Sequence, residues 1–351
     1  MISSSPQNKP KSPKFSWQKI IKKYENPHLW RSIWQLTNTL VPYFALLYLM
    51  YRSLFISYWV TVLLSVLAAG FLVRIFIIFH DCGHGSFFKS QLANDLCGFI
   101  TGVLVFTPYY HWWHSHARHH ATSGDLDRRG IGDVWTMTVE EYLKSPFWKR
   151  FGYRFSRHPV GLLVLGPTYY FLIRNRFYPP RAGHRERLSV HMTNLAIVTV
   201  AAWVGLWIGF KEYLLIQLPV IVVSATAGVW LFYVQHQFDG AYWERHGKWD
   251  YVDQAIKGSS FYKLPKILQW FTGNIGFHHI HHLSPRIPNY YLEKVHRAST
   301  IFKKVKPITL LVSLRSLRFR LWDEKGQKLV SFRFLKSLRK KKQEPSKKFT
   351  E

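Results

Sequence analysis

The chain has 351 residues, of which 48 are Lys or Arg and 19 are Asp or Glu, so its formal net charge is +29. Two cysteines are too few for a disulfide scaffold, and 48% hydrophobic residues are too many for a disordered tail protein. Most aromatic residues lie in apolar runs rather than among basic residues. We therefore expect an anionic lipid surface, and no nucleic acid, as the partner.

The first long apolar block runs from residue 40 to residue 79 and contains only two charged residues, Arg52 and Arg74. At about 1.5 Å per residue it makes about 60 Å of helix, roughly twice the hydrocarbon thickness of a bilayer. The block therefore predicts two membrane spans, at about 39–56 and 58–80, with a turn where Arg52 and two serines interrupt it.

A second block, 192–235, repeats this design and is interrupted at Gly209 and Lys211. It predicts two more spans, at about 193–210 and 213–235. The expected fold class is an all-α integral membrane protein with four transmembrane helices arranged as two hairpins.

Three shorter stretches are expected to lie at the membrane surface. The apolar segments 96–109 and 160–173 are short for crossing a bilayer, so we expect interfacial or re-entrant helices there. Between residues 297 and 338 basic and apolar residues alternate, which predicts either a strand or an amphipathic stretch near the headgroups.

The charges outside the apolar blocks predict the orientation. Basic residues outnumber acidic ones before residue 40, whereas the two hairpin turns carry few charges. By the positive-inside rule we expect a multi-pass protein of the cell membrane with both termini on the cytoplasmic side. We divide the chain into a basic cytoplasmic N-terminal tail (1–37), a membrane domain (38–337) and a basic C-terminal tail (338–351). No charged and apolar leader precedes the first block, so we expect no cleaved signal peptide.

The 18 histidines are concentrated just after the apolar blocks. Three motifs, HDCGH, HWWHSHARHH and FHHIHH, place imidazoles three or four residues apart, so each set is expected to share one helix face. A further histidine ends the fourth span. The candidate metal ligands, which we also treat as the catalytic residues, are His80, His84, His116, His119, His120, His236, His278, His281 and His282.

Nine imidazoles exceed the six or so ligands that one ion accepts, so the motifs predict two metal ions in a cytoplasmic cap. Imidazole binds iron, zinc and copper alike, and a single histidine in a membrane helix is often only a packing residue. A carboxylate-bridged metal site is disfavoured, because only Glu293 and His296 form a Glu-x-x-His pair, which we interpret as a surface coincidence. Cys82 and Cys97 are expected to be reduced apolar fillers.

The segments HDCGHGSFF, HSHARHH and GNIGFHHIHHLSP look like the three histidine boxes of the membrane fatty acid desaturases. The stretches between them, such as GVWLFYVQHQF, most resemble the acyl-lipid branch that acts at the Δ5 position, as found in Bacillus. The resemblance extends from about residue 35 to 335. It implies that two iron ions held by histidine use O2 and two electrons to insert a cis double bond into the acyl chains of membrane phospholipids.

The resemblance also bears on the electron donor. Many relatives carry a fused haem domain with an HPGG motif, but the nearest match here, at His158, reads HPVG and breaks it. The family then implies a separate donor, ferredoxin or flavodoxin. A basic run near residue 150 fits binding of phospholipid headgroups or of this acidic carrier, and it fits equally well a solvated charge run that faces the membrane; it contains Lys149, Arg150, Arg154 and Arg157.

Two alternatives stay open at this point. A hydroxylase or ketolase of the same histidine-rich group has the same ligand chemistry. A non-enzymatic metal-binding protein or transporter is disfavoured, because the histidines lie at span ends rather than at mid-bilayer. We expect His111, His114 and His279 to support the ligands, and His184 and His246 to have no role in the site.

Overall fold

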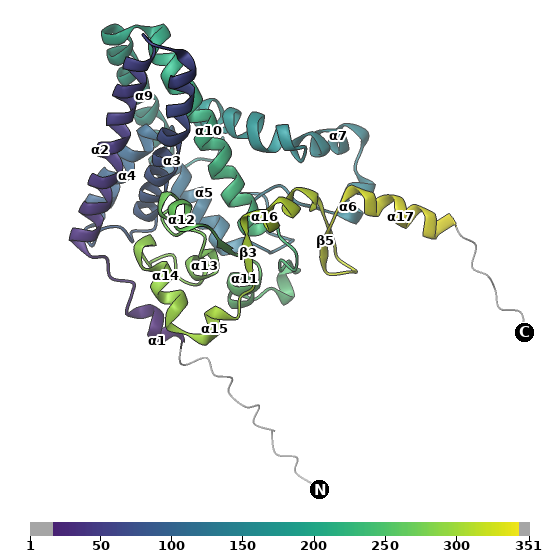
Figure 1. Ribbon diagram of the computed structural model, residues 1–351. Coiled ribbons are helices and arrows are strands. Elements are labelled where there is room, and N and C mark those ends of the chain that lie inside the picture. The colour runs from purple at the N-terminus through teal and green to yellow at the C-terminus, as the bar shows by residue number, and fades with distance from the viewer. Residues whose placement is uncertain (1–16, 344–351) are drawn as a thin grey trace, which may run out of the picture.

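The computed structural model describes residues 17–343, which form mostly helices. Four long helices form the bundle that dominates Figure 1: α2 (Leu29–Ser53), α3 (Tyr58–Gly83), α9 (His184–Ile208) and α10 (Phe210–His236). The α2–α3 turn falls where Arg52 and the serines predicted it. The α9–α10 turn is at Gly209, whose positive φ of 100° favours glycine. The two predicted helical hairpins are therefore present.

Three of these helices, α3, α9 and α10, are long and apolar enough to cross a membrane, and a bent pair, α4 with α5, is a possible fourth. Helix α2 is equally long, but its first half carries polar residues such as Gln35 and Thr39, which are buried against the rest of the protein. Of the four predicted spans, those at 58–80, 193–210 and 213–235 are therefore candidates among the described residues, whereas the one at 39–56, in α2, is not.

Polar contacts explain how charged and polar groups enter this bundle. Arg74 of α3 donates from Nε to the hydroxyl of Thr39 at 3.0 Å, and its guanidinium lies 3.9 Å from the ring centroid of Trp270. Gln35 donates to the side-chain oxygen of Asn289 at 3.1 Å. These contacts tie the first hairpin to the part of the chain that carries the third histidine box.

The short helices between the hairpins lie beside the bundle. Helices α4 (Gln91–Leu104) and α5 (Tyr109–Thr122) meet at an angle of 100°. Helix α7 (Phe147–Ser156), the π-helix η1 (Gly161–Leu165) and helix α8 (Gly166–Leu172) form an arm that leaves the bundle sideways in Figure 1. Both segments expected at the membrane surface are thus short helices, in agreement with their limited length.

The remaining elements lie toward one end of the bundle and are together called the cap; within it α6 and α17 extend sideways, away from the long helices (Figure 1). Its helices are α1 (Trp17–Lys22), α6 (Val139–Lys144), η2 (Arg174–Arg176), η3 (His246–Lys248), α11 (Tyr251–Lys257), α12 (Lys266–Phe271), α13 (His278–Leu283), α14 (Asn289–Ala298), α15 (Thr300–Lys303), α16 (Leu310–Ser313), η4 (Leu314–Arg318) and α17 (Phe332–Gln343). Its strands are β1 (Met137–Thr138), β2 (Phe261–Lys263), β3 (Pro307–Thr309), β4 (Leu321–Asp323) and β5 (Lys328–Val330).

The strands make two small sheets. In one, β4 pairs with β1 in parallel and with β5 antiparallel, and in the other β2 pairs with β3 in parallel. The stretch 297–338, for which a strand and an amphipathic segment were both open, contains three of these strands with short helices between them. Residues 17–37 of the expected N-terminal tail form α1 and the start of α2; residues 1–16 and 344–351 lie outside the described part of the chain.

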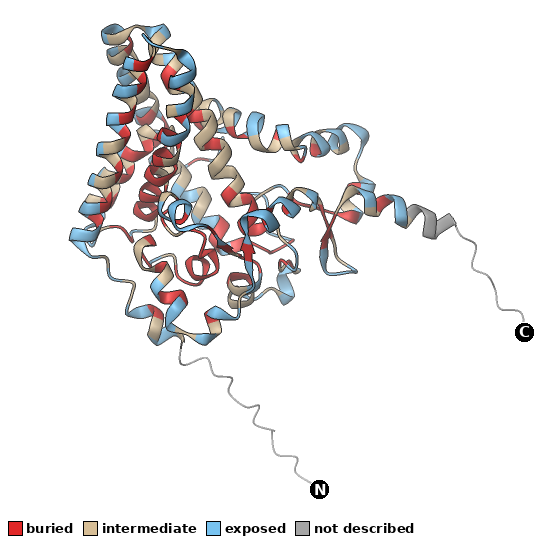
Figure 2. Ribbon diagram, in the orientation of Figure 1, coloured by how far each residue is buried: buried red, intermediate tan, exposed pale blue. Residues whose placement is uncertain are grey.

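Burial separates the two ends of the molecule. We compared the most apolar stretch of 18 residues in each helix. Only 11% of this stretch in α9 and 28% in α10 is buried within the protein, against 61% in α3. Figure 2 shows exposed residues along the outer helices and buried ones where α3 enters the cap. Exposed apolar surface on this scale is expected of helices that face lipid.

Candidate metal centre

The nine candidate histidines converge at the junction of bundle and cap, where they form two groups. The five-histidine group consists of His80, His84, His116, His120 and His281. The four-histidine group consists of His119, His236, His278 and His282. Within each group one ring nitrogen per residue lies within 4.8 Å of all the others. Sequence reasoning thus selected every member of both groups.

The spacing of the nitrogens fits metal ions. His236 Nε2 is 3.1 Å from His119 Nε2 and 3.0 Å from His278 Nε2, and His120 Nε2 is 3.1 Å from His116 Nε2 and 3.0 Å from His281 Nε2. A neutral imidazole has only one N–H, so such triplets cannot all be satisfied by hydrogen bonds. Nitrogens bound at right angles to one ion, about 2.1 Å from it, lie about 3.0 Å apart.

Helices α5 and α13 contribute to both groups, which differs from the prediction that each box shares one face. In α5, His116 and His120 belong to the five-histidine group, whereas His119 belongs to the four-histidine group. Successive helical residues point about 100° apart, so neighbouring histidines diverge while residues four apart stay together. Helix α13 repeats this arrangement, with a pair four apart in one group and His281 in the other.

Each long hairpin contributes to one group only. His80 and His84 stand at the end of α3 in the first hairpin and belong to the five-histidine group. His236 is the last residue of α10 in the second hairpin and belongs to the four-histidine group. The groups adjoin each other, since the rings of His120 and His282 stack with centroids 4.3 Å apart.

Two buried carboxylates orient one histidine in each group, and sequence reasoning missed both. Asp81 lies 3.1 Å from His80 Nδ1, and Asp133 lies 2.7 Å from His119 Nδ1. A carboxylate that accepts a hydrogen bond from Nδ1 leaves Nε2 free to bind a metal and fixes the ring. Asp81 also accepts hydrogen bonds from the backbone and side-chain nitrogens of Asn289, at 2.7 and 2.8 Å. The signal for Asp81 was its position inside the first box.

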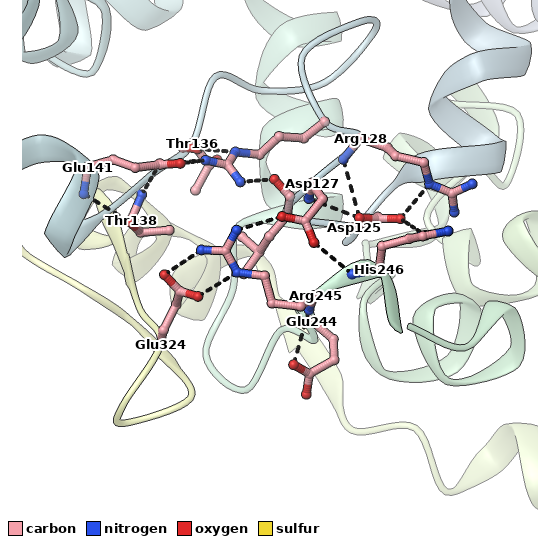
Figure 3. A network of polar contacts seen from close by, with 12 residues as sticks. Asp125, Asp127, Arg128, Thr136, Thr138, Glu141, Glu244, Arg245, His246 and Glu324 are labelled. Atoms are coloured by element: carbon pink, nitrogen blue, oxygen red, sulfur yellow. Dashed lines mark hydrogen bonds and ion pairs between the residues drawn. The ribbon is translucent and has the colours of Figure 1, made fainter. Parts of the chain in front are cut away.

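A polar network holds the loop that carries Asp133 (Figure 3). The fully buried Asp125 accepts from Arg128 Nε at 2.6 Å and lies 2.9 Å from His246 Nδ1. Arg245 forms ion pairs with Asp127 of the same loop, at 2.6 Å, and with Glu324 of the turn between β4 and β5, at 2.8 Å. It therefore joins the loop to these strands. His246, which the sequence placed outside the site, is therefore part of the loop's support and does not touch either group.

The environment keeps the imidazoles of α13 neutral. Burial, reinforced by neighbouring histidines, lowers the pKa of His278, His281 and His282 well below the usual value. Only the unprotonated ring nitrogen binds a metal, so this environment favours the binding form of each ligand.

The supporting histidines and the Glu-x-x-His pair lie outside both groups. His279 is buried and its Nε2 is 3.1 Å from His296 Nδ1, while His111 lies 3.5 Å from Glu186. Glu293 pairs with Lys266 and Arg297 at the surface, as the sequence suggested, but its partner in the motif is 9% exposed and therefore buried. The surface interpretation was wrong for His296.

The remaining candidates have structural surroundings. Both cysteines are free thiols, and neither Cys82 nor Cys97 belongs to a histidine group. His114 is exposed, and His184 is the exposed first residue of α9.

A cavity of about 1030 Å³ opens beside the two groups, and its wall includes His80, His116 and His278. Apolar residues of α3, α8 and α10 form much of its lining; among them are Leu72, Val73, Phe76, Phe171, Ile221 and Phe232. Another part of the lining is polar and reaches the surface, with Arg118, Arg174, Arg181 and Glu186. The cavity can admit a long apolar molecule with one polar end.

An apolar helical bundle with two groups of largely buried histidines beside an apolar cavity is typical of a membrane protein whose histidines could hold metal ions. The family model "Fatty acid desaturase" matches residues 56–305 of the chain. The chain is also 52% identical over 320 residues to a fatty acid desaturase of Bacillus subtilis, covering 91% of each chain. The protein therefore belongs to the fatty acid desaturase family and is an enzyme.

More distant relatives share part of the chain. An sn-1 oleoyl-lipid 12-desaturase of Synechocystis is 27% identical, covering 63% of each chain. An sn-1 acyl-lipid omega-3 desaturase (ferredoxin) of Nostoc is 26% identical, covering 67% of this chain and 64% of its own. The similarity to a Bacillus enzyme expected from the boxes and the stretches between them is thus confirmed.

Proposed function

We propose that this enzyme uses O2 to introduce a cis double bond, at the Δ5 position, into acyl chains of membrane phospholipids, with two iron ions bound by the nine histidines. The observation that carries the proposal is the position of both histidine groups along the wall of one apolar cavity. The family supports desaturation, and the resemblance of the stretches between the boxes supports the Δ5 position.

The reaction class explains why histidine-bound iron is the proposed cofactor. A methylene group has no acidic proton and no polar handle, so acid and base side chains cannot open its C–H bond. A pair of bound iron ions would supply the oxygen-activating redox chemistry that the side chains lack. Imidazole is a suitable ligand for iron, and the two histidine groups offer nine such ligands.

The protein's own residues have three tasks in this proposal. The apolar residues of α3, α8 and α10 bind the acyl chain and exclude water from the cavity. Asp81 and Asp133 hold His80 and His119 in fixed orientations. The polar part of the lining, which contains Arg174 and Glu186, accommodates the ester end of the lipid.

Substrate and electron donor are inferred from relatives. The names of the Synechocystis and Nostoc enzymes specify lipid-bound acyl chains, and the Nostoc name specifies ferredoxin. We propose phospholipid acyl chains as substrate and ferredoxin or flavodoxin as donor. We also propose a multi-pass protein of the cell membrane with a membrane domain at 38–337 and with the termini and the histidine groups on the cytoplasmic side.

Lipid analysis tests the reaction. The chain is expressed in a bacterial host that lacks desaturases, with and without air, and the phospholipid acyl chains are analysed by gas chromatography and mass spectrometry. We expect cis Δ5 monounsaturated chains only with air, and none from a His281→Ala variant. Hydroxylated chains instead of unsaturated ones would identify a hydroxylase, and a different bond position would contradict the Δ5 proposal.

Cysteine labelling tests the orientation separately. Lys211 is the second residue of α10, directly after the turn at Gly209, and Lys325 lies in the cap; both are exposed. In a background without the two native cysteines, an impermeant thiol reagent added to intact cells should label Lys211→Cys but not Lys325→Cys. Labelling of Lys325→Cys from outside would place the histidine groups outside the cell and exclude a cytoplasmic electron donor.

A further inference from the structure

A second, smaller cleft of about 320 Å³ lies between α6, α7 and α17, away from the histidine groups. Its lining combines two aromatic rings with four cations: Tyr142, Phe332, Arg150, Arg154, Arg333 and Lys336. No Asp or Glu among the described residues lines it. In Figure 1 α7 and α17 project from the same side of the bundle.

Most of this positive charge is not neutralised. Arg154 is held in place, since its Nε donates to the hydroxyl of Tyr142 at 2.6 Å and its guanidinium stacks 4.5 Å from the ring centroid of Phe332. Arg150, Arg333 and Lys336 have no acidic partner among the described residues. The two glutamates of α6 are already paired, with Lys144 and Arg129. The cleft is therefore suited to an anion.

The helix beside the cleft has the character of a membrane-surface helix. Four aromatic side chains of α7 are more than half exposed: Phe147 (61%), Trp148 (76%), Phe151 (56%) and Phe155 (53%). Their spacing of one, four and eight residues from Phe147 places them on one side of the helix. Figure 2 shows that much of α7 is exposed. Aromatic residues on one side and basic residues on another are typical of helices that lie in the headgroup region.

We propose that this basic cleft binds the headgroup of an anionic phospholipid, such as phosphatidylglycerol, whose acyl chains cover the aromatic side of α7. The proposal rests on the membrane location of the protein and adds a lipid site separate from the substrate cavity. A phospholipid satisfies both features at once, with a phosphate for the cations and chains for the aromatic rings. A folded acidic protein would cover the rim but cannot enter a space of this size.

The bound lipid would hold the arm that walls the substrate cavity. Helix α7 continues into η1 and α8, and residues of both, including Gly161, Pro167 and Phe171, line that cavity.

The fold divides the basic run near residue 150 that the sequence analysis singled out. Arg150 and Arg154 face the cleft, whereas Arg157 is buried at 1% exposure and donates to Thr136 at 2.8 Å and Tyr233 at 3.2 Å.

Lipid binding to the purified full chain tests the proposal without any need for bound metal. Native mass spectrometry in detergent measures binding of dioleoylphosphatidylglycerol, dioleoylphosphatidylcholine and glycerol 3-phosphate. The variant is Arg150→Gln/Arg333→Gln/Lys336→Gln. The control, Lys263→Gln/Lys304→Gln/Lys306→Gln, removes the same charge from exposed lysines outside the cleft. A single variant, Arg333→Gln, serves if the triple variant does not fold.

We expect the wild type and the control to bind phosphatidylglycerol more tightly than phosphatidylcholine. Each basic residue near an anionic surface contributes roughly fivefold to binding, so the triple variant should lose on the order of a hundredfold and Arg333→Gln roughly fivefold. Equal phosphatidylglycerol binding by variant and control would overturn the proposal. Glycerol 3-phosphate binding as tight as the lipid's would make the cleft a free-phosphate site.

Discussion

The two histidine groups draw on the same boxes but are anchored in different parts of the chain. The five-histidine group includes His80 of α3 and His84 directly after it, and is therefore tied to the first hairpin, whereas the four-histidine group is tied to the second hairpin by His236 alone. Helices α5 and α13 supply both groups. The comparison indicates that the two adjoining histidine groups link the two helical hairpins. On the side of the second hairpin, the link depends on the imidazole of His236 alone.

The largest expected effect is the loss of ligands from either group. We expect His84→Ala and His281→Ala in the five-histidine group, and His119→Ala in the four-histidine group, to lower desaturation more than about 100-fold, since the reaction we propose needs both ions. Lipid analysis of the desaturase-free host measures the effect. The control is His184→Ala, an exposed residue outside both groups. Full activity of the His119 or His281 variant would contradict the assignment.

The difference between the groups is tested most directly at His236. Its Nε2 lies within 3.1 Å of two other imidazole nitrogens, so we expect His236→Ala to retain one iron per chain instead of two and to be inactive. Because metal binding to the folded state stabilises it, the melting temperature of the wild type should fall on chelation, and that of the variant should fall less. Iron analysis and thermal unfolding in detergent measure both effects.

His184→Ala again provides the matched control for this comparison. An active His236→Ala protein with two irons per chain would reduce His236 to a packing residue and leave eight ligands. A variant that loses both irons would show that the groups do not bind independently.

The sequence predicted which histidines lie together better than how they divide into two groups. All nine histidines could be selected because helical spacing and the ends of apolar blocks are visible in one dimension. The division of the nine histidines between the two groups could not be predicted, because it depends on which side of α5 and of α13 each group lies. Asp133 was invisible for a related reason: it lies 14 residues after His119 and returns to it only through a folded loop. His296 was misjudged because its partner His279 lies 17 residues away in sequence and meets it only in the folded chain.

The orienting carboxylates should have intermediate effects that differ between the groups. Loss of such a partner typically costs 10- to 100-fold in metal affinity or activity. The loss of metal affinity or activity caused by Asp133→Asn should lie in this range, and the deficit in bound iron should be confined to the four-histidine group. Asp81→Asn should also lower the melting temperature, because Asp81 receives two hydrogen bonds from Asn289. Iron titration with a competing chelator and thermal unfolding separate the two results; equal unfolding of both variants would contradict the comparison.

The smallest expected effect concerns the network around Asp125, which supports only the four-histidine side. Asp125 is fully buried, so Asp125→Ala removes the acceptor of Arg128 and of two backbone N–H groups and should cost about 1–3 kcal/mol of stability. Asp253→Ala is the matched control, since its ion pair with Lys257 is exposed and of the helical type that contributes about 0.3–0.5 kcal/mol.

Asp125→Ala should lower iron in the four-histidine group only slightly, because the loop that carries Asp133 retains the contacts of Arg245 with Asp127 and Glu324. Thermal unfolding of the apo-protein isolates the structural cost, and iron content of the loaded protein isolates the effect on the site. If Asp125→Ala lost as much iron as Asp133→Asn, the network would have to be counted with the orienting residues of the metal centre. If instead Asp125→Ala and Asp253→Ala unfolded alike, burial of Asp125 would contribute nothing to holding the loop.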